Sequence, residues 1–337
     1  MAAGEAIEVQ DTGRGAPAWA GVDPVTFGDA VADLSHFGLI AVEGPDAQKF
    51  LASLFTGDVR LVSASQGQFT SWCDGKGRIL TTFWLFVRGE AYHILLPKEL
   101  LPSTLTRLRQ FLLRSKATIS DATETLARVG LSGPGLTKRL AEALGGEAPT
   151  ARGETRSYGD LTLVALGGPQ PRWILAGPPA AVEALTQKLQ PGLLPVEAGA
   201  WSLLDILAGL PLVSPETSEE FIPQMLNLEA LGGLCFTKGC YPGQEVVARL
   251  QYRGQLKRRL YLAYADSDRA PPPGAKLYGP GTTESVGLVV SAAPLPTGKI
   301  ALLAVVVIEQ KAAGDIHLED LQGPRLEFQE PDVSAAA

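Results

Sequence analysis

Apolar positions between residues 35 and 120 follow first the spacing of strands and then the spacing of helices. Phe37 to Val42 is an apolar run of strand length, and Gly44-Pro45-Asp46 after it is typical of a helix start. Further strand-like runs are Gln68 to Cys73, Ile79 to Val87 and Tyr92 to Leu96. Leucines at every third or fourth position from Leu101 to Leu112 then predict a helix with one apolar face.

The same order of elements returns further along the chain. A shift of 89 positions places Gly44-Pro45 on Gly133-Pro134 and Leu51 on Leu140. Strand-like runs then cover Leu126 to Leu131, Leu161 to Leu166 and Trp173 to Ala176, and a helix is expected from Pro178 to Leu189. Residues 35–210 therefore predict two β-α-β-β-α units, each a small ferredoxin-like sheet with helices on one side. Chance recurrence of Gly-Pro in a chain rich in both residues is the alternative.

From Arg249 onward the pattern becomes rich in strands. Apolar runs are separated by Ala270-Pro-Pro-Pro-Gly274 and Pro294-Leu-Pro-Thr-Gly298, which is typical of a small antiparallel barrel or sandwich. We therefore expect an α+β protein with two α+β subdomains, at residues 30–120 and 121–248, and a C-terminal antiparallel β-barrel at residues 249–330.

Composition narrows the class of protein. Of 337 residues, 45% are hydrophobic and 19% are charged, which is typical of a globular chain. The net charge of -7 argues against a broad surface for nucleic acid, so no direct DNA binding is expected. Three cysteines favour a reducing compartment over a disulfide framework. With no signal-like N-terminus and no apolar run of membrane-spanning length, we expect a cytoplasmic protein without membrane contact.

A glycine-dense segment from Gly232 to Gly243 contains the strongest candidate for chemistry. Cys240 follows Lys238, whose ammonium favours a reactive thiolate, and Gln244 and Glu245 add an amide and a carboxylate nearby. The alternative is that Cys240 is a small buried hydrophobe. Cys235, between Leu234 and Phe236, has the apolar neighbours of a structural cysteine, while Cys73 fits either interpretation. No group of His, Cys or acidic residues has metal-ligand spacing, so no metal is expected.

The segment Lys238 to Glu245 resembles the signature K-G-C-Y-x-G-Q-E of the YgfZ family. Its matching positions are Lys238, Gly239, Cys240, Tyr241, Gly243, Gln244 and Glu245. The flanks F-I-P-Q and N-L-E-A-L-G-G, and the earlier segments T-G-D-V and C-D-G-K-G-R-I, also resemble the family. The likeness covers roughly residues 30–310.

The resemblance implies a fold, a cofactor and partners. Members of this family are similar to the T-protein of the glycine cleavage system, with three domains in a ring that receives tetrahydrofolate. They support the assembly or repair of iron–sulfur enzymes, including ones that modify tRNA, under oxidative stress. The expected partners are therefore folate and iron–sulfur proteins or their assembly machinery. Cys240 and Lys238 become the expected catalytic pair, with Tyr241, Gln244 and Glu245 toward the cofactor.

The resemblance also assigns aromatic contacts for the folate. Two family tryptophan positions correspond to Phe37 and Trp201, and a flat pterin can stack on such rings. Packing in the core is the alternative for both. Arg253, in a basic cluster after the motif, is expected to bind the glutamate tail of folate. The alternatives for this cluster are solvated charge and phosphate contacts with tRNA.

Thr81 and Thr82 stand where the T-protein has acidic residues, and a hydroxyl does not replace a carboxylate as a base. We therefore expect no glycine-cleavage activity, and the sequence leaves open whether the chain is an enzyme. Two other functions stay open: a folate-dependent one-carbon transferase of the T-protein group, and a non-catalytic folate-gated scaffold.

Overall fold

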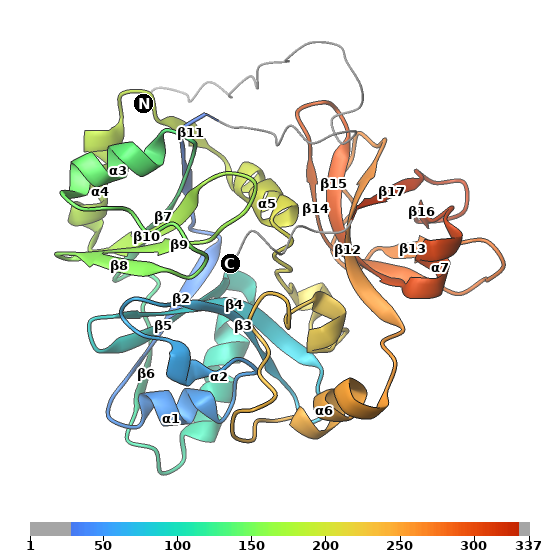
Figure 1. Ribbon diagram of the computed structural model, residues 1–337, viewed down its shortest axis with the longest axis horizontal. Helices are drawn as coiled ribbons and strands as arrows, with labels where there is room; N and C mark the ends of the chain where they lie inside the picture. The colour runs from blue at the N-terminus through green and yellow to red at the C-terminus, as the bar shows by residue number, and fades with distance from the viewer. Residues whose placement is uncertain (1–27, 330–337) are drawn as a thin grey trace.

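The computed structural model describes residues 28–329, which form two α+β units followed by a C-terminal antiparallel sheet (Figure 1). Helix α5 (Ala198–Leu207) lies between the second unit and the C-terminal sheet. In the described part of the chain, four short 3-10 helices connect the larger elements, at Val59–Leu61, Lys98–Leu100, Pro215–Thr217 and Pro223–Leu226. Within residues 28–329, no helix has the length and apolar character needed to cross a membrane.

The first unit is a five-stranded sheet in the order β3-β4-β5-β2-β6. Its strands are β2 (Phe37–Glu43), β3 (Gln68–Cys73), β4 (Ile79–Arg88), β5 (Ala91–Pro97) and β6 (Thr118–Asp121). Its helices are α1 (Ala47–Ala52) and α2 (Leu101–Leu112). The predicted apolar face of α2 is confirmed, because its leucines turn inward. A side chain at Gly38 would come within 2.7 Å of Leu101, so α2 packs directly on the backbone of β2.

The second unit is a six-stranded sheet in the order β11-β1-β7-β10-β9-β8. Its strands are β1 (Ala30–Asp33), β7 (Ala127–Ser132), β8 (Thr155–Tyr158), β9 (Leu161–Ala165), β10 (Arg172–Gly177) and β11 (Leu194–Val196). Its helices are α3 (Leu136–Leu144) and α4 (Pro179–Leu189). Strand β1 precedes the first unit in the chain, yet it pairs antiparallel with β7 and parallel with β11.

The two units repeat the same local topology. Strands β3-β4-β5-β2 and β8-β9-β10-β7 occur in the same order and are antiparallel throughout. The predicted repeat is therefore present, with three strands between the helices of each unit. The three runs expected in the first unit are all strands, whereas only two were expected in the second. The predicted ferredoxin-like β-α-β-β-α order is wrong in this respect. In the second unit the missed strand is β8, whose sequence T-R-S-Y gives little apolar signal because it lies at the sheet edge.

The C-terminal sheet has six strands in the order β16-β13-β14-β15-β12-β17. Its elements are β12 (Arg258–Ala265), β13 (Lys276–Tyr278), β14 (Gly287–Pro294), β15 (Ile300–Val307), α7 (Ile308–Ala313), β16 (His317–Leu318) and β17 (Leu326–Gln329). The predicted antiparallel pairing is confirmed. Backbone hydrogen bonds from Leu318 to Pro324 (3.0 Å) and from Leu326 to Ile316 (2.8 Å) join its two ends. The sheet is therefore strongly curled.

One apolar core links the first unit, α5 and the outer face of the curled sheet. In β12, Leu260, Leu262 and Tyr264 face this core, whereas the residues between them face the interior of the curled sheet. This alternation follows from the two-residue period of a strand. The second unit has a separate core of its own between its sheet and helices α3 and α4.

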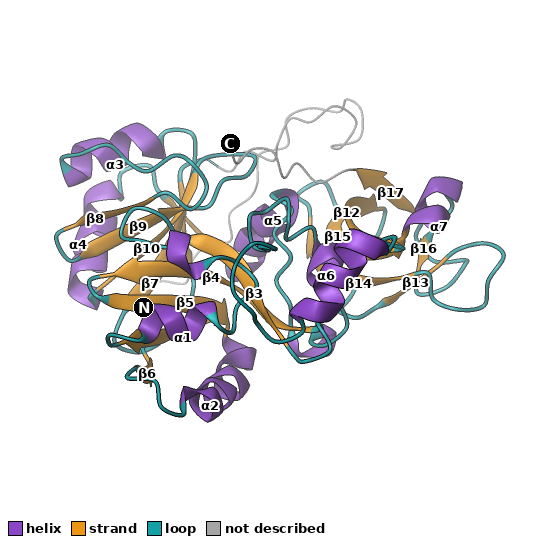
Figure 2. Ribbon diagram, turned by 60° about the horizontal axis from the view of Figure 1, so that its bottom comes forward, coloured by secondary structure: helices purple, strands orange, loops and turns teal. Residues whose placement is uncertain are grey.

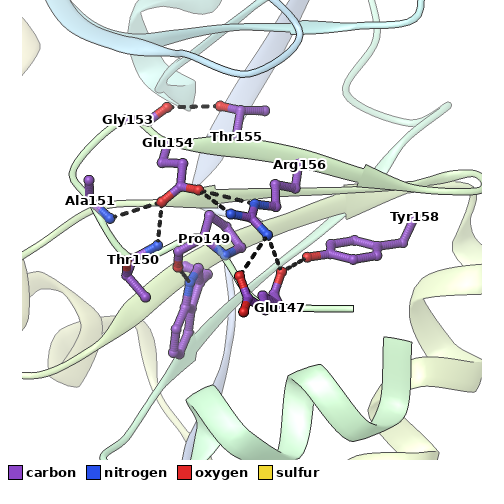
Figure 3. A network of polar contacts seen from close by, with 10 residues as sticks. Glu147, Pro149, Thr150, Ala151, Gly153, Glu154, Thr155, Arg156 and Tyr158 are labelled. Atoms are coloured by element: carbon purple, nitrogen blue, oxygen red, sulfur yellow. Dashed lines mark hydrogen bonds and ion pairs between the residues drawn. The ribbon is translucent and has the colours of Figure 1, made fainter. Parts of the chain in front are cut away.

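The two α+β units also contact each other through backbone. Gly67 donates to the carbonyl of Gly153 (2.6 Å), and Thr155 donates to the carbonyl of Ser65 (2.9 Å). The loop before β8 is held by Glu154, which accepts from the backbone of the loop and from Arg156 (Figure 3). These bonds fix the position of one unit against the other beside the central core.

Candidate functional site

A small enclosed cavity lies where both α+β units meet α5. Its volume is about 10 Å³, which is room for about one water molecule. The lining side chains are Leu34, Phe37, Phe69, Trp84, Leu95, Leu166, Ile174, Trp201, Asp205, Leu210 and Leu212. Both aromatic residues that the family resemblance singled out, Phe37 and Trp201, therefore share one cavity.

The rings of Phe37 and Trp201 are firmly packed. Trp201 is 2% exposed, and a side chain at Gly130 of β7 would overlap its indole ring. The indole therefore rests on bare backbone of the second unit. Phe37 is 4% exposed, and its ring centroid lies 4.4 Å from that of His36. The two residues belong to the core and also to the cavity wall. Their positions are therefore compatible both with core packing and with contact to a ligand.

A buried ion pair links Asp205 of the cavity wall to Arg172, which is not itself a lining residue. Arg172 donates from Nη1 to Oδ1 of Asp205 at 2.6 Å, and from Nε to the carbonyl of Gly167 at 2.8 Å. The guanidinium carbon lies 5.5 Å from the centroid of the Trp201 ring. Burial raises the pKa of Asp205, and the guanidinium acts in the opposite direction. Among the cavity-lining residues, Asp205 is the one carboxylate.

Further hydrogen-bonding atoms near this ion pair have no partner among the described residues. They are Nη2 of Arg172 and both ring nitrogens of His36. Burial lowers the pKa of His36, while the charge of Asp205 acts against this shift. Sequence reasoning missed all three polar residues. The available signal was a charge inside an apolar run, as in R-W-I-L-A for Arg172 and W-S-L-L-D-I-L for Asp205, since buried charges are rare without a partner.

The glycine-dense loop is anchored to the segment that follows α1. The carbonyl of Gly233 accepts from the hydroxyls of Thr56 (2.7 Å) and Thr70 (2.9 Å). The amide of Cys235 donates to the carbonyl of Thr56 at 2.9 Å. The T-G-D-V segment noted in the sequence is thus the support on which the cysteine loop rests.

Lys238 is the deepest anchor of this loop. Its ammonium is buried, donates to the carbonyls of Phe55 and Gly57, and lies 5.0 Å from the centroid of the Tyr241 ring. Burial lowers the pKa of Lys238 to about 8, with Asp58 and the Cys235 thiol acting in the opposite direction. The sequence suggested that this ammonium would activate Cys240, but it points to backbone oxygens, and Cys235 is the thiol that affects its pKa.

Tyr241 packs beside the lysine. Burial raises the pKa of its phenol, and the hydroxyl has no hydrogen-bond partner among the described residues. The ring and the ammonium together close the inner side of the loop. Tyr241 therefore lies beneath the loop surface, away from the cavity that contains Phe37 and Trp201.

The three cysteines differ in exposure. Cys240 is exposed, Cys235 is half-buried with its sulfur 3.4 Å from the Thr237 hydroxyl, and Cys73 is buried. Burial raises the pKa of Cys73, which disfavours its thiolate. Of these three thiols, that of Cys240 is therefore the most accessible to another molecule.

Helix α6 (Gln244–Arg253) carries the remaining sequence-predicted residues (Figure 2). Gln244 and Glu245 form its first turn, and Arg253 its last. Glu245 is 86% exposed and pairs with Arg249 at 2.9 Å, so it faces solvent. Arg253 is also exposed. The structure places Glu245 and Arg253 on the surface with Cys240, leaves Gln244 half-buried, and keeps all four apart from the central cavity.

Sheet geometry separates the cavity from the cysteine loop. Phe69 lines the cavity, whereas its neighbour Thr70 binds the loop at Gly233. Successive residues of a strand point to opposite faces, so the loop anchor and the cavity lie on opposite sides of β3. The predicted site residues thus fall into two groups that share no lining residue.

Thr81 and Thr82 have structural bonds at the edge of the central core. The Thr82 hydroxyl donates to the carbonyl of Pro211 (2.8 Å) and accepts from the amide of Val213 (2.9 Å). The Thr81 hydroxyl donates to the carbonyl of Thr82 (3.2 Å). Thr82 thus holds the segment after α5 in place, and Asp205 supplies the carboxylate that the cavity contains.

The architecture defines the class of protein. It matches the glycine cleavage system aminomethyltransferase T of Bartonella henselae with a TM-score of 0.70 and 18% identity, over 90% of this chain and 86% of that one. The fold is that of aminomethyltransferase T. Residues 22–175 also match the GCVT N-terminal domain family.

Sequence relatives narrow this class to one family. The tRNA-modifying protein YgfZ of Colwellia psychrerythraea is 36% identical over 68% of this chain and 69% of the relative. The protein of the same name from Photorhabdus laumondii is 32% identical over 88% of this chain and 90% of the relative. The chain belongs to the YgfZ family.

Proposed function

We propose that this protein binds a reduced folate in the central cavity and supports tRNA modification by maintaining iron–sulfur enzymes, with Cys240 as its working thiol. The observation that carries the proposal is that Phe37, Trp201 and Asp205 line one cavity, with Asp205 bound to the buried Arg172. The relatives named tRNA-modifying protein YgfZ support the link to tRNA modification, and the aminomethyltransferase fold supports the folate.

The side chains of the cavity wall match the chemistry of a pterin, but the cavity is too small to hold one in this conformation. A pterin is flat and aromatic and carries several hydrogen-bonding atoms, which aromatic walls and a carboxylate can engage. Ligand cavities usually measure about 300–1,000 Å³, and the volume here is about 10 Å³. Binding therefore requires the wall to open. Trp201 is backed by Gly130, so the half-buried Leu212 is the wall residue that we expect to move.

The thiol of Cys240 serves a different partner from the folate in this proposal. Cys240 is exposed, whereas the cavity is enclosed and lies across β3 from the loop anchors. We therefore assign Cys240 to contact with a partner protein, an iron–sulfur enzyme or a component of its assembly machinery. A one-carbon transferase remains the alternative, but Thr81 and Thr82 offer no carboxylate for that reaction.

Calorimetric titration with tetrahydrofolate tests the cavity. Trp201→Ala should weaken binding by about tenfold or more, because a stacking face is lost. Trp173→Phe is the matched control, since Trp173 is equally buried but belongs to the second unit's own core. Trp201→Phe keeps a ring if Trp201→Ala fails to fold. Unchanged affinity in both Trp201 variants would remove this cavity from the proposal.

Complementation tests the thiol. A strain without this protein should lose tRNA methylthiolation, which depends on iron–sulfur enzymes, most clearly under oxidative stress. The wild-type gene and Cys235→Ser should restore it, and Cys240→Ser should restore it poorly. Full rescue by Cys240→Ser under oxidant would favour the scaffold function over a working thiol.

A further inference from the structure

A second and much larger cavity lies at the far end of the first unit's sheet. Its volume is about 510 Å³, within the range of small-molecule sites. It opens beside the β4–β5 turn and the connection from β6 to β7, and it shares no residue with the central cavity. The lining side chains used below are Glu43, Arg88, Glu90, His93, Ser120 and Thr125.

Two of these lining residues contain buried nitrogen atoms without a hydrogen-bond partner among the described residues. Arg88 donates from Nη2 to the carbonyl of Asp160 at 2.9 Å, but its Nε has no acceptor. His93 is 3% exposed, and its Nδ1 is also unpartnered. Buried polar atoms in native proteins usually have a partner, so this cavity is suited to a polar occupant.

The imidazole of His93 is held as a neutral group. Its ring stacks on Phe86 with centroids 5.5 Å apart and an interplanar angle of 17°. Burial lowers the pKa of His93 to about 4; the backbone of Ala91 acts against this shift, and the charge of Arg88 adds to it. A neutral imidazole can donate from one nitrogen and accept at the other.

The cavity combines one cation with two carboxylates. Arg88 and the exposed Glu43 and Glu90 all line it, and none of them forms an ion pair with another residue in the range 28–329. The hydroxyls of Ser120 and Thr125 add further hydrogen-bonding groups. A simple anion would face two like charges here, and a simple cation would face Arg88. A molecule that carries both charges avoids each repulsion.

We propose that this cavity binds a small zwitterion of the α-amino acid class. Its carboxylate would take the free donors of Arg88, because guanidinium and carboxylate match in geometry. Its ammonium would lie toward Glu43 and Glu90. The alanines and the leucine of the lining provide an apolar surface for a side chain. This site is independent of the proposed folate cavity.

A ligand screen with the full-length protein tests the proposal. Thermal shift with the standard amino acids, followed by calorimetry, should identify at least one that binds. The amide of that amino acid, which lacks the carboxylate, and its deaminated acid, which lacks the ammonium, should each bind about tenfold more weakly or worse. Arg88→Met should weaken binding to the same extent, and Glu43→Gln with Glu90→Gln should weaken it several-fold.

Control variants separate the loss of the proposed site from the general effect of removing a charge. Arg114→Met removes an exposed arginine elsewhere in the first unit and should bind the amino acid as wild type does. Because Arg88 also contacts Asp160, the glutamate variants give a second test that leaves this contact in place. The proposal is overturned if no amino acid binds, if Arg88→Met binds normally, or if the amide or the deaminated acid binds as well as the zwitterion.

Discussion

One buried cation lies against the wall of the central cavity and another in the cysteine loop, and the two are accommodated in opposite ways. Arg172 is 1% exposed and faces the carboxylate of Asp205 at 2.6 Å. Lys238 is 8% exposed, and its direct partners among residues 28–329 are carbonyl oxygens and an aromatic face. The first cation has a counter-charge bound directly to it. The second has a lowered pKa, so its charge depends on pH.

The largest effect should come from breaking the paired cation. Arg172→Met leaves Asp205 buried without a counter-charge, and we expect the free energy of unfolding to fall by about 3–5 kcal/mol. Urea denaturation measures this change. Arg156→Met is the control, because Arg156 also has carboxylate partners but is 40% exposed, and its loss should lower the free energy of unfolding much less than the loss of Arg172 does.

A double variant sharpens this first test. Arg172→Met combined with Asp205→Leu removes both charges and should recover most of the stability lost by Arg172→Met alone. If the double variant is as unstable as the single one, Arg172 stabilises the fold through the packing of its guanidinium against Trp201 rather than through its charge.

An intermediate effect, dependent on pH, is expected for Lys238. Between about pH 8 and pH 10.5 the native lysine has lost its proton while the unfolded one retains it, so the unfolded state binds more protons. Stability contributed through this group therefore rises with pH across that window and is constant above it. The unfolding free energy of wild type minus that of Lys238→Met should therefore increase with pH across this window.

Chemical denaturation at several values between pH 7 and pH 10.5 measures this slope. Lys76→Met removes an exposed lysine and controls for the loss of one positive charge. A constant difference between wild type and Lys238→Met across the window would show that Lys238 titrates as an exposed lysine does, and would contradict its buried position.

The smallest effect on stability should be at the exposed thiol. Cys240→Ser should change the free energy of unfolding by less than about 0.5 kcal/mol, as at most surface positions. Cys73→Ser should cost about 1–3 kcal/mol, because it buries a hydroxyl. Alkylation followed by mass spectrometry should label Cys240 first, Cys235 more slowly and Cys73 only on unfolding. Faster labelling of Cys235 would reverse the proposed roles of the two loop cysteines.

Local elements were predictable because their signals are local. The bounds of β3 agree with the sequence prediction at both ends, and α2 follows from the spacing of its leucines. The repeat of the two units was visible from the recurrence of Gly-Pro and leucine positions. Strand β8 was missed because an edge strand of polar residues has no apolar alternation.

The candidate site was predictable only in part. Family resemblance named Phe37 and Trp201, but their shared cavity depends on the packing of three segments distant in sequence. The Arg172–Asp205 pair joins residues 33 positions apart, and no periodicity encodes such a pairing. Lys238 was expected to face Cys240 because the two are close in sequence. The fold instead turns its side chain inward, because the carbonyls of Phe55 and Gly57 accept its hydrogen bonds.

The position of β1 has a consequence for how the chain is made on the ribosome. This strand is synthesised before the first unit, yet its partners β7 and β11 lie about 100 and 160 residues later. The first unit can complete its own sheet while β1 is still without a partner. The edge of β7 in the second unit is then covered by β1, a strand that precedes the first unit in the chain. A fragment that starts after the first unit would therefore emerge with that edge open and prone to pair with another chain.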